Sequence, residues 1–210
     1  MNATKVATAA PLSELQRQIV LGAIGVLSVV TAVIALRYFV APPETTLLGQ
    51  KAGWHRPMLL LHTAGGVVAL LIGPFQFWKH WRDRNLKRHR LLGKIYLIAV
   101  LLGGLAGAFV ATGANGGPSA RVGFAFLSVG WLVTGWMAWR RILTRDIQAH
   151  YEWMLRNFAL TFAAVTLRLW LPVLQMSGFT FAEAFQTVAW LCWVPNLVVV
   201  EVFLGRQRGA

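Results

Sequence analysis

Residues 150–170 read HYEWMLRNFALTFAAVTLRLW, a stretch that is long and apolar enough to cross a bilayer. The same stretch carries a histidine, an asparagine, two threonines and two arginines. Such groups are costly at the hydrocarbon centre and are tolerated where protein or water can satisfy them. The pattern therefore predicts a helix in the interior of a membrane bundle, with its polar side chains turned toward its neighbours.

The composition of the whole chain supports this interpretation. Of 210 residues, 57% are hydrophobic, only 13% are charged and ten are tryptophans, which excludes a soluble globular domain. Six apolar stretches approach the roughly 20 residues that a spanning helix needs: 18–40, 57–78, 90–112, 121–139, 150–174 and 184–204. The first is too long for a signal peptide and is expected to be retained as an anchor.

We therefore predict an all-α fold, a polytopic membrane bundle of about six transmembrane helices. It consists of one domain over residues 18–205, an N-terminal segment over 1–17 and a short tail over 206–210. The lipid bilayer is the one partner that this fold requires, and the sequence does not indicate an oligomeric state.

The distribution of basic residues predicts how the bundle is oriented. The net charge is +13, but the cations concentrate in two loops, KHWRDRNLKRHR and RRILTRD, so the charge does not indicate nucleic acid binding. With both termini cytoplasmic, fourteen Lys and Arg side chains, including Lys5, lie inside, and four, including Lys51, lie outside. This asymmetry follows the positive-inside rule and predicts cytoplasmic termini.

Helical geometry sorts the polar residues of the fifth span. At 3.6 residues per turn, His150, Asn157, Thr161 and Arg168 fall within about 20° of one line, and Met154 lies about 40° from it. His150 is predicted at the cytoplasmic boundary and Arg168 at the external one. Arg156 lies off this stripe and needs a partner of its own, for which Glu201 is the acid at a matching depth.

Two other spans combine a histidine with small residues along one face. In the third span the face comprises His89, Gly93, Tyr96, Val100, Gly103 and Gly107, and in the second it comprises His62, Gly66, Ala69 and Gly73. Small residues at this spacing let helices approach closely. They also leave room for a flat ligand with histidine at its rim. The spacing alone does not decide between these alternatives.

Other catalytic signatures are absent from the sequence. It contains no HExxH, GxSxG or Walker-type glycine loop, so no catalytic residue is identified and enzymatic activity is left unassigned. The single cysteine, Cys192, permits no intrachain disulfide. Pro195 and Asn196 interrupt the sixth span, where a kink is the simplest interpretation.

Four segments together resemble a known family: LLLHTAGGVVALLIGPFQF, HRLLGKIYL, DIQAHYEWMLRNFALTFAAVTLRLWLP and WLCWVPNLVVVE. They are similar to the signature blocks of the bacterial membrane protein family catalogued as domain of unknown function 2306, over residues 58–204. The resemblance implies a multi-pass helical protein of the bacterial cytoplasmic (inner) membrane. Its signature positions match residues that include His62, Gln76, His89, Gly93, Tyr96, His150, Met154, Arg156, Thr161, Arg168, Asn196 and Glu201.

One functional hypothesis is a membrane redox protein. His89 and His150 begin two spans that run in the same direction, so they can be the axial ligands of one b-type haem near the cytoplasmic face. Gly93 would leave room for the ring, Tyr96 would line the site, and Arg156 or a loop arginine would pair with a propionate. The electron partner would be a quinone or another membrane redox protein.

The alternative hypothesis is a non-redox protein that binds or transfers a small molecule or metal ion, or that helps a membrane complex to assemble. A soft metal such as copper could use His89, His150 and Met154. His62 and Arg168 would form a second, outer site for an anion or a carbonyl group. Purely structural polar contacts, with no cofactor, form a third interpretation.

Overall fold

A computed structural model describes residues 13–40 and 55–208. Lys5, Lys51 and most of the predicted N-terminal segment lie outside the described residues, as do the last two residues of the tail. The regular elements within the described residues are all helices: α1 (Glu14–Ala35), α2 (Arg37–Val40), α3 (His55–Phe77), α4 (Lys79–Arg84), α5 (Leu86–Thr112), α6 (Gly117–Leu143), α7 (Ile147–Thr161), α8 (Ala163–Met176), α9 (Phe181–Leu191) and α10 (Val194–Arg208).

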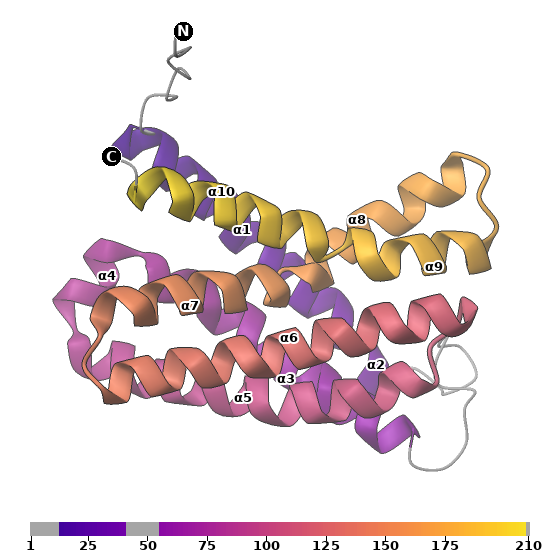
Figure 1. Cartoon of the computed structure of the whole chain (residues 1–210), viewed down its shortest axis with the longest axis horizontal. Coiled ribbons are helices and arrows are strands. Elements are labelled where there is room, and N and C mark those ends of the chain that lie inside the picture. Colours follow the sequence, from indigo (N-terminus) through magenta and orange to yellow (C-terminus); the bar gives the residue numbers. More distant parts are fainter. Residues whose placement is uncertain (1–12, 41–54, 209–210) are drawn as a thin grey trace, which may run out of the picture.

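These helices form the six predicted spans. Three spans are single helices, α3, α5 and α6, while α1 with α2, α7 with α8, and α9 with α10 form the first, fifth and sixth. The start of α1 and the end of α10 lie toward the end of the bundle that carries α4 and the turn between α6 and α7 (Figure 1). We call this the α4 end. The prediction that it faces the cytoplasm rests on its basic residues.

Polar side chains fix where several spans begin. Ser13 caps α1 in a reciprocal capping box with Gln16, and Thr180 caps α9 in the same way with Glu183. The side chains of Asn85 and Asp146 accept backbone N–H groups at the starts of α5 and α7. Each cap satisfies an N–H group that a helix leaves free at its first turn.

The α3 and α5 helices approach each other through glycine. A Cβ atom added to Gly65 would lie only 2.6 Å from the Ala99 carbonyl oxygen and 2.8 Å from the Gly103 Cα. A side chain cannot be accommodated there unless the two backbones separate. The small residues at this crossing therefore serve close helix packing.

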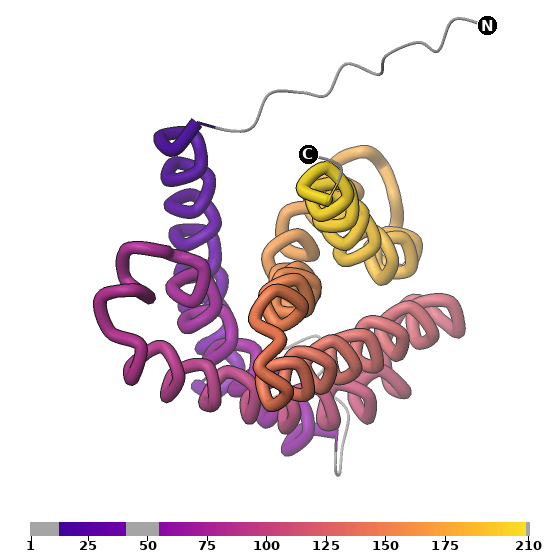
Figure 2. Tube along the Cα trace, turned by 60° about the vertical axis from the view of Figure 1, so that its left-hand side comes forward, coloured from indigo at the N-terminus to yellow at the C-terminus, as the bar shows by residue number. Residues whose placement is uncertain are grey.

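The α7 helix lies in the middle of the molecule, with α1 on one side and α10 on the other (Figure 2). It packs against α6, α10 and α3. All five residues from Asn157 to Thr161 are buried, Asn157 completely. The predicted inward orientation of the polar stripe is confirmed for Asn157 and Thr161, and the burial extends to Phe158 and Leu160 on other faces of the helix.

The fifth span is not the continuous helix that the stripe geometry assumes. It breaks at Phe162, where the Val165 amide donates to the Phe162 carbonyl three residues back, at 2.9 Å. The Thr166 hydroxyl also bonds back to the carbonyls of Phe162 and Ala163. Such back-bonding bends helices. The prediction that His150 and Arg168 lie on one line assumed a continuous helix, so it does not hold across this break.

The sixth span breaks between α9 and α10, just before Pro195. The Asn196 amide donates to the Cys192 carbonyl at 2.9 Å, and across the interface to the Ala159 carbonyl of α7 at 3.1 Å. The Thr166 hydroxyl donates to the same Cys192 carbonyl. The expected proline kink is present, and side chains satisfy the backbone there.

Candidate functional site

A buried polar cluster occupies the centre of the bundle. The Tyr96 hydroxyl donates to Asn157 Oδ1 at 2.7 Å and lies 2.8 Å from Thr161 Oγ1. The Trp131 indole N–H donates to the same Thr161 oxygen at 2.8 Å. The Asn157 amide donates to the Trp131 carbonyl and to Thr134 Oγ1, at 2.8 and 2.9 Å. The cluster joins α5, α6 and α7.

Every side chain in this central cluster is engaged by another. Tyr96 and Asn157 are both 0% exposed. The Tyr96 hydroxyl was predicted to line a cofactor site, but its hydrogen bonds are made to Asn157 and Thr161. The central cluster therefore holds helices together, which is the structural role of polar groups in membrane bundles.

A second polar group lies at the α4 end and is not satisfied. Both polar atoms of Gln76, a residue only 5% exposed, and the buried Nδ1 of His89 have no hydrogen-bond partner among the described residues. Gln76 Oε1 lies 3.6 Å from the position that a Cβ of Gly93 would occupy, one turn after His89 on α5. Buried polar atoms without partners are costly and call for a ligand, an ion or water.

His150 belongs to the same end of the bundle. Its Nδ1 lies 2.9 Å from the Ala138 carbonyl oxygen, which can only accept, so Nδ1 carries the proton and Nε2 keeps a lone pair. His89 and His150 lie in the first turns of α5 and α7, which both begin at this end. We refer to Gln76, His89 and His150 as the inner site.

Most of the glycines on the two predicted faces lie against other side chains of the protein. A Cβ atom added at three of these glycines would contact an aromatic or imidazole ring. The ring belongs to Phe158 at Gly73, to Trp131 at Gly103 and to His62 at Gly107. At these positions close packing is the correct alternative and the flat ligand is not supported. Gly66 and Gly93 have more room than the other glycines of these faces. A Cβ atom at Gly66 would contact nothing within 4 Å, and one at Gly93 would contact only Gln76 Oε1 at 3.6 Å.

The two residues of the predicted outer site each bond to a backbone carbonyl. His62 Nδ1 donates to the Gly103 carbonyl at 2.9 Å, and its ring packs edge-on against Trp131. Arg168 donates to the Ala164 carbonyl at 2.7 Å, and its charge reaches His62. The role of His62 and Arg168 as a binding site for an anion or a carbonyl group remains a prediction.

Arg156 has the acidic partner that its position required. Its Nε and Nη2 donate to the two carboxylate oxygens of Glu201 at 2.6 and 2.9 Å, which ties α7 to α10. Glu152 and Arg208 extend this network. Because its guanidinium is committed to Glu201, Arg156 is a poor candidate for a propionate partner, and Arg90, the residue after His89 on α5, is a better one.

Met154 is 6% exposed and belongs to the main apolar core, so its thioether contacts protein rather than an open site. No group of three or more His, Cys, Asp or Glu side chains in the described part of the chain is arranged to hold a metal ion. Sequence reasoning had not selected Gln76 as a site residue. A glutamine within a span next to a glycine face was the signal that could have identified it.

The fold and these polar sites define a multi-pass helical membrane protein whose interior is held together by a hydrogen-bonded core. The sequence model of the predicted membrane protein family DUF2306 matches residues 59–204, and the chain belongs to this family. No curated protein and no solved structure gives a significant match.

Proposed function

We propose that this protein is a membrane redox protein that binds a b-type haem between His89 and His150. The observation that carries the proposal is the inner site. Two histidines from the first turns of different helices lie at one end of the bundle, beside buried polar atoms that lack partners among the described residues. The haem would supply one-electron transfer, with a quinone or another membrane redox protein as electron partner.

The donor set of the inner site fits such a ligand. A metal-bound histidine usually donates its second ring N–H to a carbonyl or carboxylate, which orients the ring. His150 already makes this bond to the Ala138 carbonyl, so its Nε2 lone pair is available. The buried His89 Nδ1 lacks such an acceptor, and the unpartnered Gln76 Oε1 lies near Gly93, one turn away. Gln76 would thus be the positioning residue for His89.

The surrounding charges favour the same ligand. Arg90 follows His89 directly on α5 and belongs to the basic α4 end. Carboxylates of a bound haem would be neutralised by arginine at a membrane surface. His55 and His62 lie on α3 away from the α4 end, so His89 and His150 are the one histidine pair that we assign to a haem in the described residues.

The test is the absorption spectrum of the full chain purified from membranes of haem-replete cells. The reduced protein should show the paired visible bands of a six-coordinate haem. His89→Ala and His150→Ala should each abolish them, whereas His80→Ala, a change at an exposed position on α4, should not. Gln76→Leu should keep the bands and shift the reduction potential, because it removes the acceptor for His89.

Two results would refute the proposal. One is a colourless preparation that is folded and monodisperse. The other is a spectrum that survives both histidine substitutions. If the colourless protein instead bound copper(I) in a manner that depended on Met154, the metal-transfer alternative would replace the haem.

A further inference from the structure

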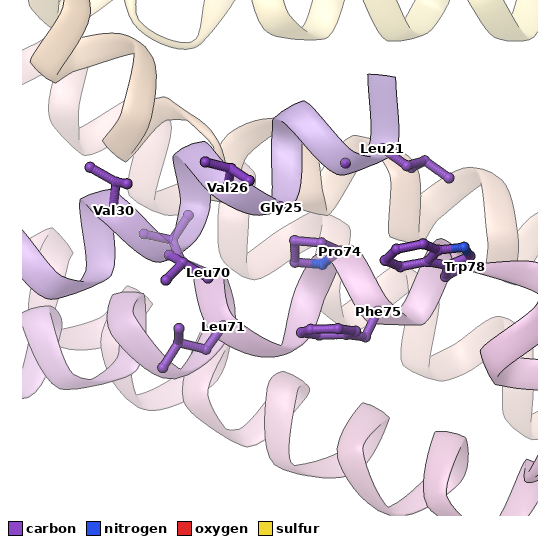
Figure 3. A pocket seen from close by; sticks show the side chains of 11 residues that line it. Leu21, Gly25, Val26, Val30, Leu70, Leu71, Pro74, Phe75 and Trp78 are labelled. Carbon is purple, nitrogen blue, oxygen red and sulfur yellow. The ribbon is translucent and has the colours of Figure 1, made fainter. Parts of the chain in front are cut away.

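An apolar groove with a volume of about 390 Å³ runs between α1 and α3 (Figure 3). Its lining consists of leucine, valine, glycine, proline, phenylalanine and tryptophan side chains. Two glycines of α1 provide the space, because a Cβ at Gly22 meets nothing within 4 Å and one at Gly25 meets only the Pro74 Cβ at 3.9 Å. The groove therefore requires an apolar occupant from the membrane.

The length of the groove matches one leaflet. On α1 it extends from Leu21 to Val30, ten residues or about 13–14 Å, and along α3 from Leu70 to Trp78, just beyond the end of the helix, about 12 Å. Half of the hydrocarbon core measures about 15 Å. An acyl chain of a lipid in the leaflet at the α4 end would fill the groove without crossing into the other leaflet.

Aromatic side chains mark the outlet of the groove. Phe75 and Trp78 are stacked with their ring centroids 6.5 Å apart, and the Trp81 ring lies 6.1 Å from Phe75. Trp78 immediately precedes α4. Tryptophan is enriched at the headgroup level of membranes, so this aromatic group indicates where the polar part of a lipid would lie.

Two arginines continue the two walls of the groove beyond the aromatic group. Arg17 precedes Leu21 by one turn of α1, and Arg82 follows Trp78 by four residues, with its amide bonded to the Trp78 carbonyl at 3.0 Å. Leu21 and Trp78 lie beside each other at one end of the groove (Figure 3), so both arginines lie beyond that same end. Their acidic neighbours, Glu14 at 3.9 Å and Asp83 at 3.0 Å, are exposed. Exposed pairs of this kind are weak and easily exchanged.

We propose that this groove is a binding site for an anionic phospholipid, with one acyl chain between α1 and α3 and the phosphate between Arg17 and Arg82. The site does not depend on haem binding. A bound lipid would hold α1 against the bundle, because the face of α1 that includes Val26 and Val30 is otherwise exposed. An anionic headgroup is favoured over a zwitterionic one by the positive charge at the α4 end.

The test uses the full chain in detergent, titrated with dioleoylphosphatidylglycerol or dioleoylphosphatidylcholine, with the retained lipid counted by native mass spectrometry. The wild-type protein should retain one phosphatidylglycerol, with an affinity at least about fivefold higher than for phosphatidylcholine. Gly22→Leu should block the groove and remove tight binding. Its matched control is Ala23→Leu, at an exposed neighbour on α1 outside the lining.

The headgroup contact is tested separately. Arg17→Gln should weaken phosphatidylglycerol binding about fivefold and leave phosphatidylcholine unchanged. Arg206→Gln removes the same charge from the α4 end, away from the groove, and should have no such effect. Gly22→Leu should not impair folding, since leucine favours helix more than glycine does. Equal affinity for the two lipids, or unchanged binding by Gly22→Leu, would overturn the proposal, as would a quinone that displaces phosphatidylglycerol at lower concentration.

Discussion

The substitution Tyr96→Phe tests whether the central polar cluster stabilises the bundle. It removes one hydroxyl and conserves the ring, so it opens no large cavity. The lost hydroxyl takes with it the 2.7 Å bond to Asn157 and the 2.8 Å contact with Thr161. A hydrogen bond between membrane helices contributes about 0.6 kcal/mol on average and up to about 1.7 kcal/mol. The expected loss in free energy of unfolding is therefore about 1–3 kcal/mol.

Reversible unfolding in mixed micelles of mild detergent and dodecyl sulfate, followed by circular dichroism, measures this loss. Tyr38→Phe makes the same chemical change in α2, away from the cluster, and should be nearly neutral. Asn157→Leu should be more harmful, because it deprives the Trp131 carbonyl and Thr134 of their donor. In the double variant the two effects should fall short of additivity, as expected for residues in one network. A Tyr96→Phe variant as stable as Tyr38→Phe would refute the reasoning.

Three further predictions concern the bundle as a whole. Reporter fusions after positions 85 and 145 should report cytoplasm and those after 48 and 116 the exterior, and the opposite pattern would reverse the orientation. Arg156→Gln should loosen α10 and make it more accessible to protease, because Glu201 loses a bidentate partner, and adding Glu201→Gln should restore part of the protection. Gly65→Ala should destabilise the protein by about 1–3 kcal/mol in the unfolding assay, while Gly66→Ala should be neutral or stabilising, since only the first meets backbone atoms.

The six spans and their order could be predicted from the sequence because the bilayer imposes a simple rule. A spanning helix must satisfy its own backbone and present an apolar surface over a fixed length. The structure places all six where the apolar stretches indicated, with helix ends shifted by a few residues at caps such as Ser13 and Asp146. The depth of polar residues in the bilayer was also predictable. It matched Arg156 with Glu201, and this pairing is confirmed.

The side chains that pack against the glycine faces could not be predicted from the sequence. Periodicity shows that Gly73, Gly103 and Gly107 share faces with histidines, but it does not show what opposes them. That depends on which ring of a different helix arrives there: Phe158 from α7, Trp131 from α6 or His62 from α3. Helix rotation and crossing determine these neighbours, and one sequence contains no record of either.

The break at Phe162 was hidden for a different reason. Hydropathy treats the fifth span as one apolar run, and its proline, Pro172, lies ten residues beyond the break. The local cause is hydrogen bonding by Thr166, whose hydroxyl bonds back within its own helix and across to Cys192. The bond to Cys192 joins two spans that are separate in the sequence, so the environment of this threonine depends on tertiary structure.

The polar residues buried between the spans differ in whether the protein satisfies them, and the difference bears on where a ligand could bind. Between helices in lipid, apolar contact offers no hydrophobic driving force, so buried hydrogen bonds contribute specificity to packing. Asn157 and Thr161 serve this purpose, and each makes several hydrogen bonds. At the α4 end, both polar atoms of the buried Gln76 and the Nδ1 atom of the half-buried His89 have no partners among the described residues. A group that only held helices together would be satisfied as Asn157 is. The unsatisfied atoms therefore favour the inner site, rather than the central cluster, as the place where a ligand completes the structure.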